Sequence, residues 1–307
     1  MIGQLSARGL ASRLAGPGLA FRTGPLAFRI RSDVRSVTDG LALLYGDYPI
    51  QPDDAFCDFE LEVVRPSGLR RYLRPQVSFR FDGANTFEPL PLPHAFPLLE
   101  WAMNWCISTH VNQYLLIHAA VVERGGQAMI LPAPPGSGKS TLCAALVHRG
   151  WRLLSDEVAM IPFDGSGLRG LARPISLKNE SIGVIARFVP EGVFNTPSYN
   201  TTKGTVTHLR APTEHVRRVD ETAPAAWVVF PRWQAGAAAQ LTARDKPDTL
   251  IDLARNSFNY GVLGRRGFET MAGVVESCAC HDFVYGDLDE AMGVFDALAS
   301  PQACPQA

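Results

Sequence analysis

The segment that most constrains this chain is Ala133–Thr141, with the sequence APPGSGKST. It matches the phosphate-binding pattern G-x-x-x-x-G-K-[ST] except at the first position, where Ala133 replaces glycine. Gly136 and Gly138 let successive backbone N–H groups turn toward a phosphate. The strand-like stretch Ala128–Leu131 precedes the loop and a helical pattern follows it, which is the context that the motif requires. The segment therefore predicts nucleotide binding.

The residues of this loop have separable chemical roles. The Lys139 ammonium is expected on the β- and γ-phosphates, and the Ser140 hydroxyl is expected to ligate Mg²⁺. The helix that begins here adds the partial positive charge of its N-terminus. Compared with glycine, Ala133 adds one methyl group, which the loop tolerates if the φ of Ala133 is negative. The residues expected to contact the nucleotide are Pro135, Gly136, Ser137, Gly138, Lys139, Ser140 and Thr141. The alternative interpretation is a glycine-rich turn with an accidental lysine.

Two acids and a histidine are the other candidates for the site. Asp156 and Glu157 follow the short strand Trp151–Leu154, which comes directly after the loop helix. Carboxylate oxygens suit Mg²⁺, and a carboxylate can accept the proton of a phosphoryl acceptor. An ordinary solvated turn is the alternative. His118 lies in the apolar stretch Tyr114–Val122, expected to form a hairpin with the strand before the loop. It is either a hydrogen-bonded core residue or a site residue.

The order of these features resembles the catalytic core of the bacterial HPr kinase/phosphorylase family, and in particular the group of HprK-related kinases A. The matching core runs over Ile117–Ile161 and includes RGWRLLSDE, and weaker similarity continues in Arg173–Ile185 and Trp227–Trp233. The resemblance implies an α/β P-loop kinase domain of the PEP carboxykinase-like type that binds ATP and Mg²⁺.

The resemblance also implies a role for each polar residue. Asp156 would be the general base toward a hydroxyl acceptor, typically serine, and Lys139 would bind the phosphates. Glu157, with Ser140 and the neighbouring Asp156, would serve the metal. His118 would lie near the base and influence its protonation.

The chain departs from the family pattern at three places. Ala133 replaces the first glycine of the loop, and Glu157 replaces the second aspartate of the acidic pair. Ser176–Glu180 replaces a later signature that contains Glu and Arg beside glycines and that is linked to the phosphate-releasing activity. We therefore expect a kinase and not a phosphorylase. Lys178 and Arg232 are either phosphate or substrate contacts or plain surface charges.

Length and composition bound the rest of the organisation. A chain of 307 residues with 46% hydrophobic and 19% charged residues can bury a core of one large or two modest domains. We expect a small α+β domain over residues 1–110 and the α/β catalytic domain over residues 111–307. A net charge of −1 gives no electrostatic case for binding nucleic acid or an anionic membrane. No apolar stretch approaches the roughly 20 residues of a membrane helix.

The cysteines and the N-terminal segment Met1–Arg22 favour a cytoplasmic protein. The six cysteines are scattered, which favours reduced thiols in the cytoplasm over a disulfide scaffold. The cluster Cys278–His281 is expected to pack and not to bind a metal. Met1–Arg22 contains three arginines and no acid, and we interpret it as a basic arm of a cytosolic protein, with an organelle transit peptide as the alternative. Val193–Thr207, rich in Thr, Ser, Asn and Gly, is expected to be a mobile loop.

The sequence thus predicts an ATP-dependent, Mg-dependent serine kinase whose acceptor is a protein or a small molecule. One alternative is a non-catalytic, ATP-gated binding or assembly module. Another is a small-molecule, carboxykinase-like enzyme with an anion pocket near Lys178 and Arg232. The resemblance also implies a small PqqD-like peptide-binding protein as a partner. The acceptor, and whether the chain forms a homo-oligomer, stay open.

Overall fold

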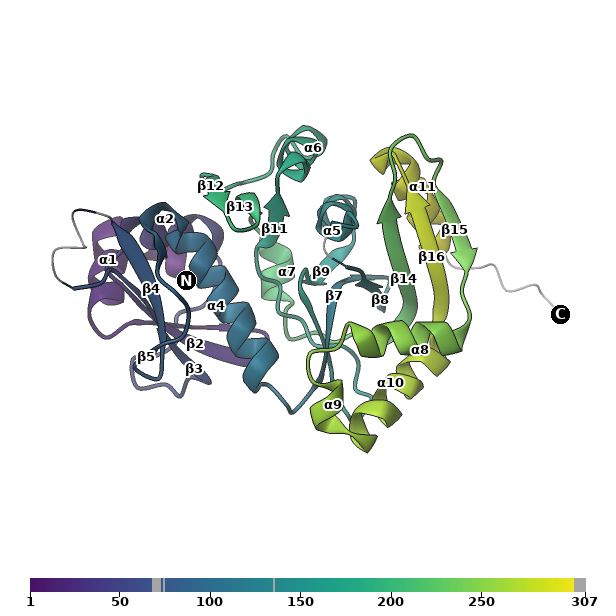
Figure 1. The fold of residues 1–307 in the computed structure, drawn as a ribbon, viewed down its shortest axis with the longest axis horizontal. Coiled ribbons are helices and arrows are strands. Elements are labelled where there is room, and N and C mark those ends of the chain that lie inside the picture. The colour runs from purple at the N-terminus through teal and green to yellow at the C-terminus, as the bar shows by residue number, and fades with distance from the viewer. Residues whose placement is uncertain (68–72, 74, 135, 301–307) are drawn as a thin grey trace. The chain divides into compact units, whose positions relative to one another are not determined.

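The structure, a computed structural model, describes residues 1–67, 73, 75–134 and 136–300 and is a mixed α/β fold with several sheets (Figure 1). It divides into two compact units. The first unit comprises Met1–Val111, Leu154–Asp156 and Arg169–Thr222, and the second comprises Asn112–Leu153, Glu157–Leu168 and Ala223–Ala307. The predicted boundary between residues 110 and 111 coincides with the first crossing between the units to within one residue. The chain then returns to the first unit at Leu154–Asp156 and at Arg169–Thr222. The single predicted boundary does not describe these returns.

The larger sheet of the first unit has the order β1-β2-β3-β4-β5, with β6 paired to β4. All of these pairs are antiparallel except β2–β3. The strands are β1 (Leu19–Thr23), β2 (Leu26–Ser32), β3 (Phe59–Val64), β4 (Gln76–Phe81), β5 (Ala84–Asn85) and β6 (Leu90–Pro91). The helices that accompany the sheet are η1 (Ile2–Gln4), α1 (Ala7–Ala15), α2 (Arg35–Leu44), η2 (Leu92–His94) and α4 (Ala95–His110). Helix α1 packs on β2, and α4 packs on β3 and β4.

The prediction of a basic N-terminal arm is wrong. The N-terminal residues fold into α1, whose first turn is capped by Ser6, with its Oγ accepting a hydrogen bond from Gly9 N at 3.1 Å. Leu10 and Leu14, four residues apart and therefore on one helix face, are fully buried. The arginines lie on the other faces of the helix, which are exposed or partly exposed. The segment is therefore an amphipathic helix, although its basic composition suggested a solvated arm.

A second, three-stranded antiparallel sheet completes the first unit, in the order β11-β13-β12. Its elements are β11 (Ile175–Lys178), α6 (Glu180–Phe188), β12 (Ser198–Thr201), β13 (Gly204–Leu209) and α7 (Thr213–Arg217). The prediction of a mobile loop over residues 193–207 is wrong, because most of it forms the β12–β13 hairpin. Gly204, with φ +83°, provides the turn, and Asn195 Oδ1 accepts a hydrogen bond from His208 N at 2.7 Å.

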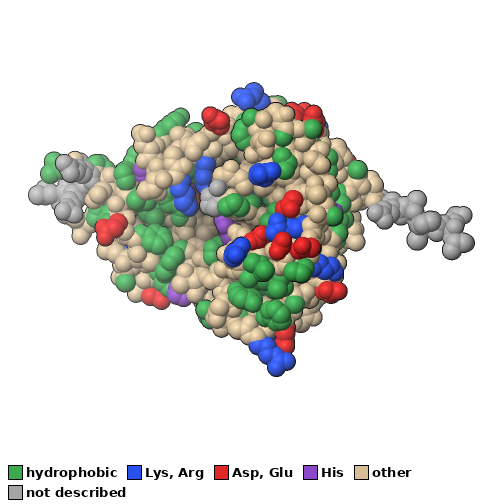
Figure 2. Space-filling view, turned by 45° about the vertical axis from the view of Figure 1, so that its right-hand side comes forward, with side chains coloured by type: hydrophobic (Ala, Val, Ile, Leu, Met, Phe, Trp, Pro, Cys, Tyr) green, Lys and Arg blue, Asp and Glu red, His purple; other side chains and the backbone are tan. Residues whose placement is uncertain are grey.

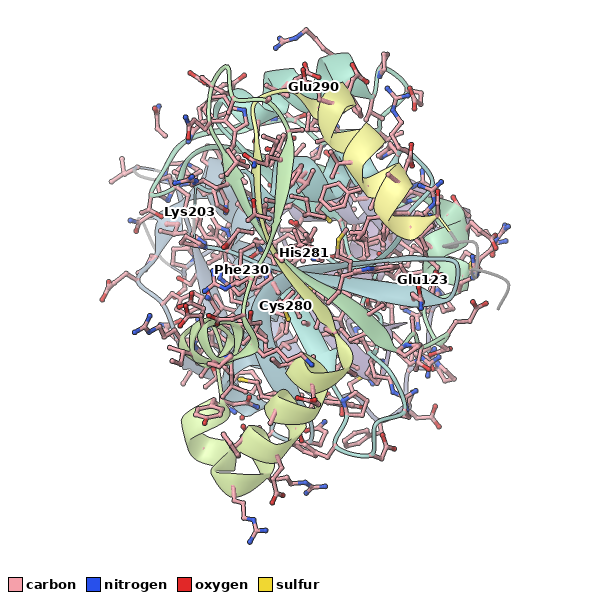
Figure 3. All side chains as sticks on the ribbon, turned by 90° about the vertical axis from the view of Figure 1, so that its right-hand side faces the viewer. Glu123, Lys203, Phe230, Cys280, His281 and Glu290 are labelled. Carbon is pink, nitrogen blue, oxygen red and sulfur yellow. The ribbon has the colours of Figure 1, made fainter. Side chains whose placement is uncertain are left out.

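The sheet of the second unit has the order β10-β7-β8-β14-β16-β15, and β9 also pairs with β7. The pairs β8–β14 and β14–β16 are parallel, and the flanking pairs are antiparallel. The strands are β7 (Leu115–Arg124), β8 (Gln127–Pro132), β9 (Arg152–Ser155), β10 (Val158–Ile161), β14 (Ala225–Trp233), β15 (Gln240–Ala243) and β16 (Ala279–Tyr285). Figure 3 looks onto this unit, with Glu123 near the tip of the β7–β8 hairpin and Phe230 and His281 on neighbouring parallel strands.

Helices cover this sheet. They are α5 (Lys139–Val147), α8 (Lys246–Arg255), α9 (Tyr260–Leu263), α10 (Arg265–Ser277) and α11 (Leu288–Ala299). Helix α11 packs on α5 and β16, whereas α10 packs on α8, β14 and β7. Large apolar side chains stay exposed on the α8–α10 segment, namely Ile251, Phe258, Val262 and Phe268. Figure 2 shows hydrophobic side chains gathered over these helices.

The predicted hairpin before the loop is confirmed. Strands β7 and β8 pair in antiparallel register from Ala119↔Pro132 to Arg124↔Gln127, and Gly125 and Gly126 form the turn with positive φ. The predicted helix after the loop corresponds to α5, and β9 follows where a strand is expected. None of the described helices combines the length and the hydropathy that crossing a bilayer requires.

The cysteines of the CxCH cluster pack in the interior. Cys278 and Cys280 are buried thiols at the start of β16, and burial raises the pKa of the Cys278 thiol to about 12. A thiol with so high a pKa is a poor nucleophile at neutral pH. Within residues 1–67, 73, 75–134 and 136–300, no group of three or more His, Cys, Asp or Glu side chains is arranged to hold a metal ion.

Candidate functional site

The glycine–lysine loop, residues 133–141, lies at the carboxyl edge of the three parallel strands of the second unit. Strand β8 ends at Pro132 and leads directly into it. Trp233 N, at the end of β14, donates to Ser137 O at 2.9 Å. Tyr285 Oη, at the end of β16, donates to Gly138 O at 3.0 Å. In open α/β sheets, ligands bind at this edge, so the strands hold the loop where a ligand is expected.

The two glycines of the described loop take left-handed conformations. Gly136 has φ +87° and Gly138 has φ +88°. A Cβ on Gly138 would lie 2.5 Å from Tyr285 Oη, whereas a Cβ on Gly136 would meet nothing within 4 Å. Gly138 is thus required by both the backbone and the available space, and Gly136 by the backbone alone. The remaining loop residue expected to contact a nucleotide, Pro135, lies outside the described residues.

Ala133, the departure from the motif, fits without strain. The described residues that combine a side chain with a positive φ are Asp82, Ala172, Asn179 and Asn200. Ala133 therefore has the negative φ that the sequence argument required, and its methyl group is buried. The alanine at the first motif position does not disturb the loop.

The loop presents polar groups suited to an anion. The Ser137 Oγ is buried and has no hydrogen-bond partner among the described residues. A buried hydroxyl without a partner is costly, and a ligand oxygen could satisfy it. Ser140 and Thr141 are partly exposed in the first turn of α5, where backbone N–H groups lack intrahelical partners. The donor set is therefore that of an anion-binding helix N-terminus.

Beside the loop, the structure brings Lys139, Glu157 and His118 together. Lys139 Nζ lies 4.0 Å from Glu157 Oε2, and His118 Nε2 lies 3.2 Å from the same oxygen. The Lys139 side chain is only 7% exposed, whereas Glu157 and His118 are 25% and 26% exposed. A single carboxylate oxygen thus faces both a buried ammonium and an imidazole. An ammonium beside a partly exposed carboxylate can exchange that partner for a phosphate.

Strand register explains how His118 reaches this cluster. In the β10–β7 pair, Val158 lies opposite His118, so the residue before β10 falls beside the histidine. His118 N donates to Asn256 O at 2.7 Å, and the His118 ring lies 5.7 Å from the Phe258 ring. These two contacts come from the segment after α8. No local motif in the sequence points to that segment.

Asp156 has a hydrogen-bond partner in the first unit. It is buried, it belongs to the first unit, and its Oδ2 accepts from Ser176 N at 3.1 Å. Glu157, the adjacent acid that His118 contacts, belongs to the second unit, as His118 does.

Two further cations that the sequence singled out lie in different units. Lys178 ends β11 in the first unit, and its backbone N donates to Ser181 Oγ at 2.8 Å. Arg232 is exposed near the end of β14 in the second unit. Sequence reasoning missed Trp233 and Tyr285 as residues that hold the loop. The only signal available was that each is an aromatic residue at the end of an apolar strand.

Comparison with known proteins gives one partial match. A family model described as ScmC, SynChlorMet cassette protein ScmC, matches residues 98–169. This range runs from α4 through the β7–β8 hairpin, the glycine–lysine loop and the Asp156–Glu157 pair, and covers less than half of the chain. None of the curated proteins matches the chain. The part of this chain that is similar to ScmC is therefore the part that carries His118, Lys139 and both acids.

Proposed function

We propose that this chain is an ATP-dependent P-loop kinase that transfers the γ-phosphate to a hydroxyl, in the first instance a serine hydroxyl. The observation that carries the proposal is the cluster beside the glycine–lysine loop, where Lys139 and His118 face one oxygen of Glu157. A buried ammonium at the start of a helix, next to an acid, is what phosphoryl transfer needs for charge stabilisation.

The residues present suit ATP and Mg²⁺. Mg²⁺ prefers one or two carboxylates together with substrate phosphates and water, so a cage of three protein acids is not required. Glu157, Ser140 and Asp156 are the residues that would hold it, and Gly136–Thr141 would hold the phosphates. The buried Ser137 hydroxyl without a partner among the described residues supports a ligand in the loop. When bound, Mg²⁺ would neutralise charge on the phosphates.

The side chains of the chain would then divide the work. Lys139 would stabilise the charge that develops on the transferred phosphoryl group. Asp156, next to Glu157 in the chain, would accept the proton of the acceptor hydroxyl. His118 would orient the Glu157 carboxylate through the contact between Nε2 and Oε2. We propose a cytoplasmic location from the scattered cysteines, and a PqqD-like peptide-binding partner from the resemblance alone.

Phosphoryl transfer can be tested with γ-labelled ATP, Mg²⁺ and the proteins and small molecules of a cell extract. We expect Asp156→Asn to lower the transfer rate by about 10²- to 10⁴-fold with ATP affinity retained. Glu157→Gln should instead raise the Mg²⁺ concentration needed for half-maximal rate. Lys139→Met should weaken ATP binding by about 10- to 100-fold, measured by calorimetry.

The variants also separate the alternatives. Wild-type protein that binds ATP through Lys139 but transfers no phosphate to any acceptor would favour the ATP-gated binding or assembly module. Transfer at the full rate by Asp156→Asn would remove the proposed base. Wild-type protein that does not bind ATP would exclude both functions.

A further inference from the structure

We propose that Trp233 binds the base of the nucleotide by stacking its indole ring on a purine, an inference that rests on the proposed nucleotide site. The residue is an exposed aromatic side chain fixed to the glycine–lysine loop. Its Cβ would lie 2.9 Å from a Cβ placed on Gly138, the residue that caps α5. The Trp233 side chain therefore begins directly beside the loop expected to bind the phosphates.

The backbone around Trp233 is held firmly. Trp233 N donates to Ser137 O at 2.9 Å, and the next residue, Gln234, donates through its N to Tyr285 O at 2.8 Å. Tyr285 closes the arrangement by donating from its Oη to Gly138 O. The strand ends and the loop thus form one hydrogen-bonded unit. An aromatic residue mounted on it is preorganised, so little ordering cost opposes binding.

The exposure of Trp233 is unusual among the tryptophans of this unit. Trp233 is 51% exposed, whereas Trp151 and Trp227 are 1% and 8% exposed and belong to the core. An isolated exposed aromatic residue needs no explanation. This one begins beside Gly138, which takes a left-handed conformation that favours glycine. The combination of a fixed backbone and an uncovered ring distinguishes Trp233 from a chance surface residue.

The ligand chemistry follows from this placement. In a nucleoside triphosphate, a ribose and an α-phosphate separate the base from the β- and γ-phosphates. A group that binds the base must therefore lie near the phosphate loop without being part of it. Aromatic side chains bind bases through their π-faces, with about 1–3 kcal/mol per base lost on substitution by alanine. A purine presents the larger face, so we expect ATP to bind more tightly than CTP.

The experiment compares ATP with inorganic tripolyphosphate, which carries the phosphates and lacks the base. Affinities with Mg²⁺ are measured by calorimetry on the full chain for wild type, Trp233→Ala, Trp233→Phe and Lys139→Met. Phe268→Ala, at a 47% exposed aromatic residue on α10, is the matched control. We expect Trp233→Ala to weaken ATP binding by about 5- to 100-fold and to leave tripolyphosphate binding unchanged. Trp233→Phe should stay within about threefold of wild type.

Intrinsic fluorescence adds an independent readout. ATP should quench the tryptophan emission of the wild type more strongly than tripolyphosphate does, and the difference should vanish in Trp233→Phe. Equal ATP affinity for wild type and Trp233→Ala, with Lys139→Met impaired, would overturn the role of Trp233 and leave the proposed site standing. Equal weakening of both ligands by Trp233→Ala would make the residue a structural support of the loop. If wild type binds neither ligand, the nucleotide site itself fails.

Discussion

Buried cations lie beside glutamates in both units, and the Arg173–Glu100 pair of the first unit differs in kind from the Lys139–Glu157 pair of the second. The second unit also contains a sealed pair, Arg152–Glu123, with side chains 6% and 7% exposed. In the first unit, Arg173 Nη2 lies 2.5 Å from Glu100 Oε2, with side chains 8% and 4% exposed. In the second unit, Lys139 Nζ lies 4.0 Å from Glu157 Oε2, and the glutamate is 25% exposed. The first pair is sealed, whereas the second is looser and reaches the surface.

The two ion pairs also differ in their other hydrogen-bond partners. Arg173 also donates to Asn104 Oδ1 at 2.6 Å and to Tyr45 Oη at 3.4 Å, and Tyr45 donates to Glu100. Burial opposes the charge of Arg173, but Tyr45 and Glu100 outweigh it and raise the pKa of the guanidinium. Glu157, by comparison, shares one oxygen between Lys139 and His118. A buried ion pair with every partner in place is structural, whereas one that shares a partly exposed carboxylate can exchange partners with a ligand.

The largest expected change in the free energy of unfolding comes from breaking the buried Arg173–Glu100 pair. Arg173→Met should lower the free energy of unfolding by about 3–5 kcal/mol, because it leaves the Glu100 carboxylate buried without its cation. Lys139→Met should change it by no more than about 1 kcal/mol, since Glu157 reaches solvent and keeps His118. Urea denaturation monitored by circular dichroism measures both.

A double variant controls this comparison. Arg173→Met combined with Glu100→Leu removes both charges, and we expect it to recover most of the lost stability. If Lys139→Met destabilised the protein as strongly as Arg173→Met, the distinction between a structural pair and an exchangeable one would fail.

A smaller loss of stability is expected from changing Tyr285, which holds the glycine–lysine loop from the end of β16. Tyr285→Phe removes the hydrogen bond to Gly138 O and should cost about 0.5–1.5 kcal/mol of stability. The cost should lie at the low end, because Gly138 O also accepts from Leu142 N at 2.9 Å. A loop that has lost this support should bind ATP about two- to tenfold more weakly. Calorimetry and urea denaturation measure the two effects, and unchanged values for both would show that Tyr285 does not hold the loop.

The smallest effect on stability concerns His281, which is half-buried on β16 and whose buried Nδ1 has no hydrogen-bond partner among the described residues. Burial lowers the pKa of this imidazole from its ordinary value of 6.5. As pH falls below that value, the unfolded chain takes up the proton first. Stability should therefore decrease with falling pH and level off once the folded form is also protonated. Urea denaturation between about pH 5 and 8 should give a shallower slope for His281→Gln than for wild type. Identical slopes would contradict the prediction.

Much of the second unit was predictable because its pattern is local. The apolar strand, the turn at Gly125–Gly126 and the glycine–lysine loop lie in one short stretch, and backbone preferences alone place them in order. The N-terminal helix α1 was not predicted, because its arginines suggested a solvated arm. The β12–β13 hairpin was not predicted either, since Thr, Ser and Asn are as typical of loops as of short edge strands.

The sequence by itself determined the glycine–lysine loop, the strand and helix on either side of it, and the presence of two acids after the next strand. These depend on residue type and spacing along a few turns of chain. Only the tertiary structure decided that His118 contacts Glu157, and that Trp233 and Tyr285 hold the loop. The reason is physical: strand pairing brings together residues far apart in sequence, and register sets which side chains meet.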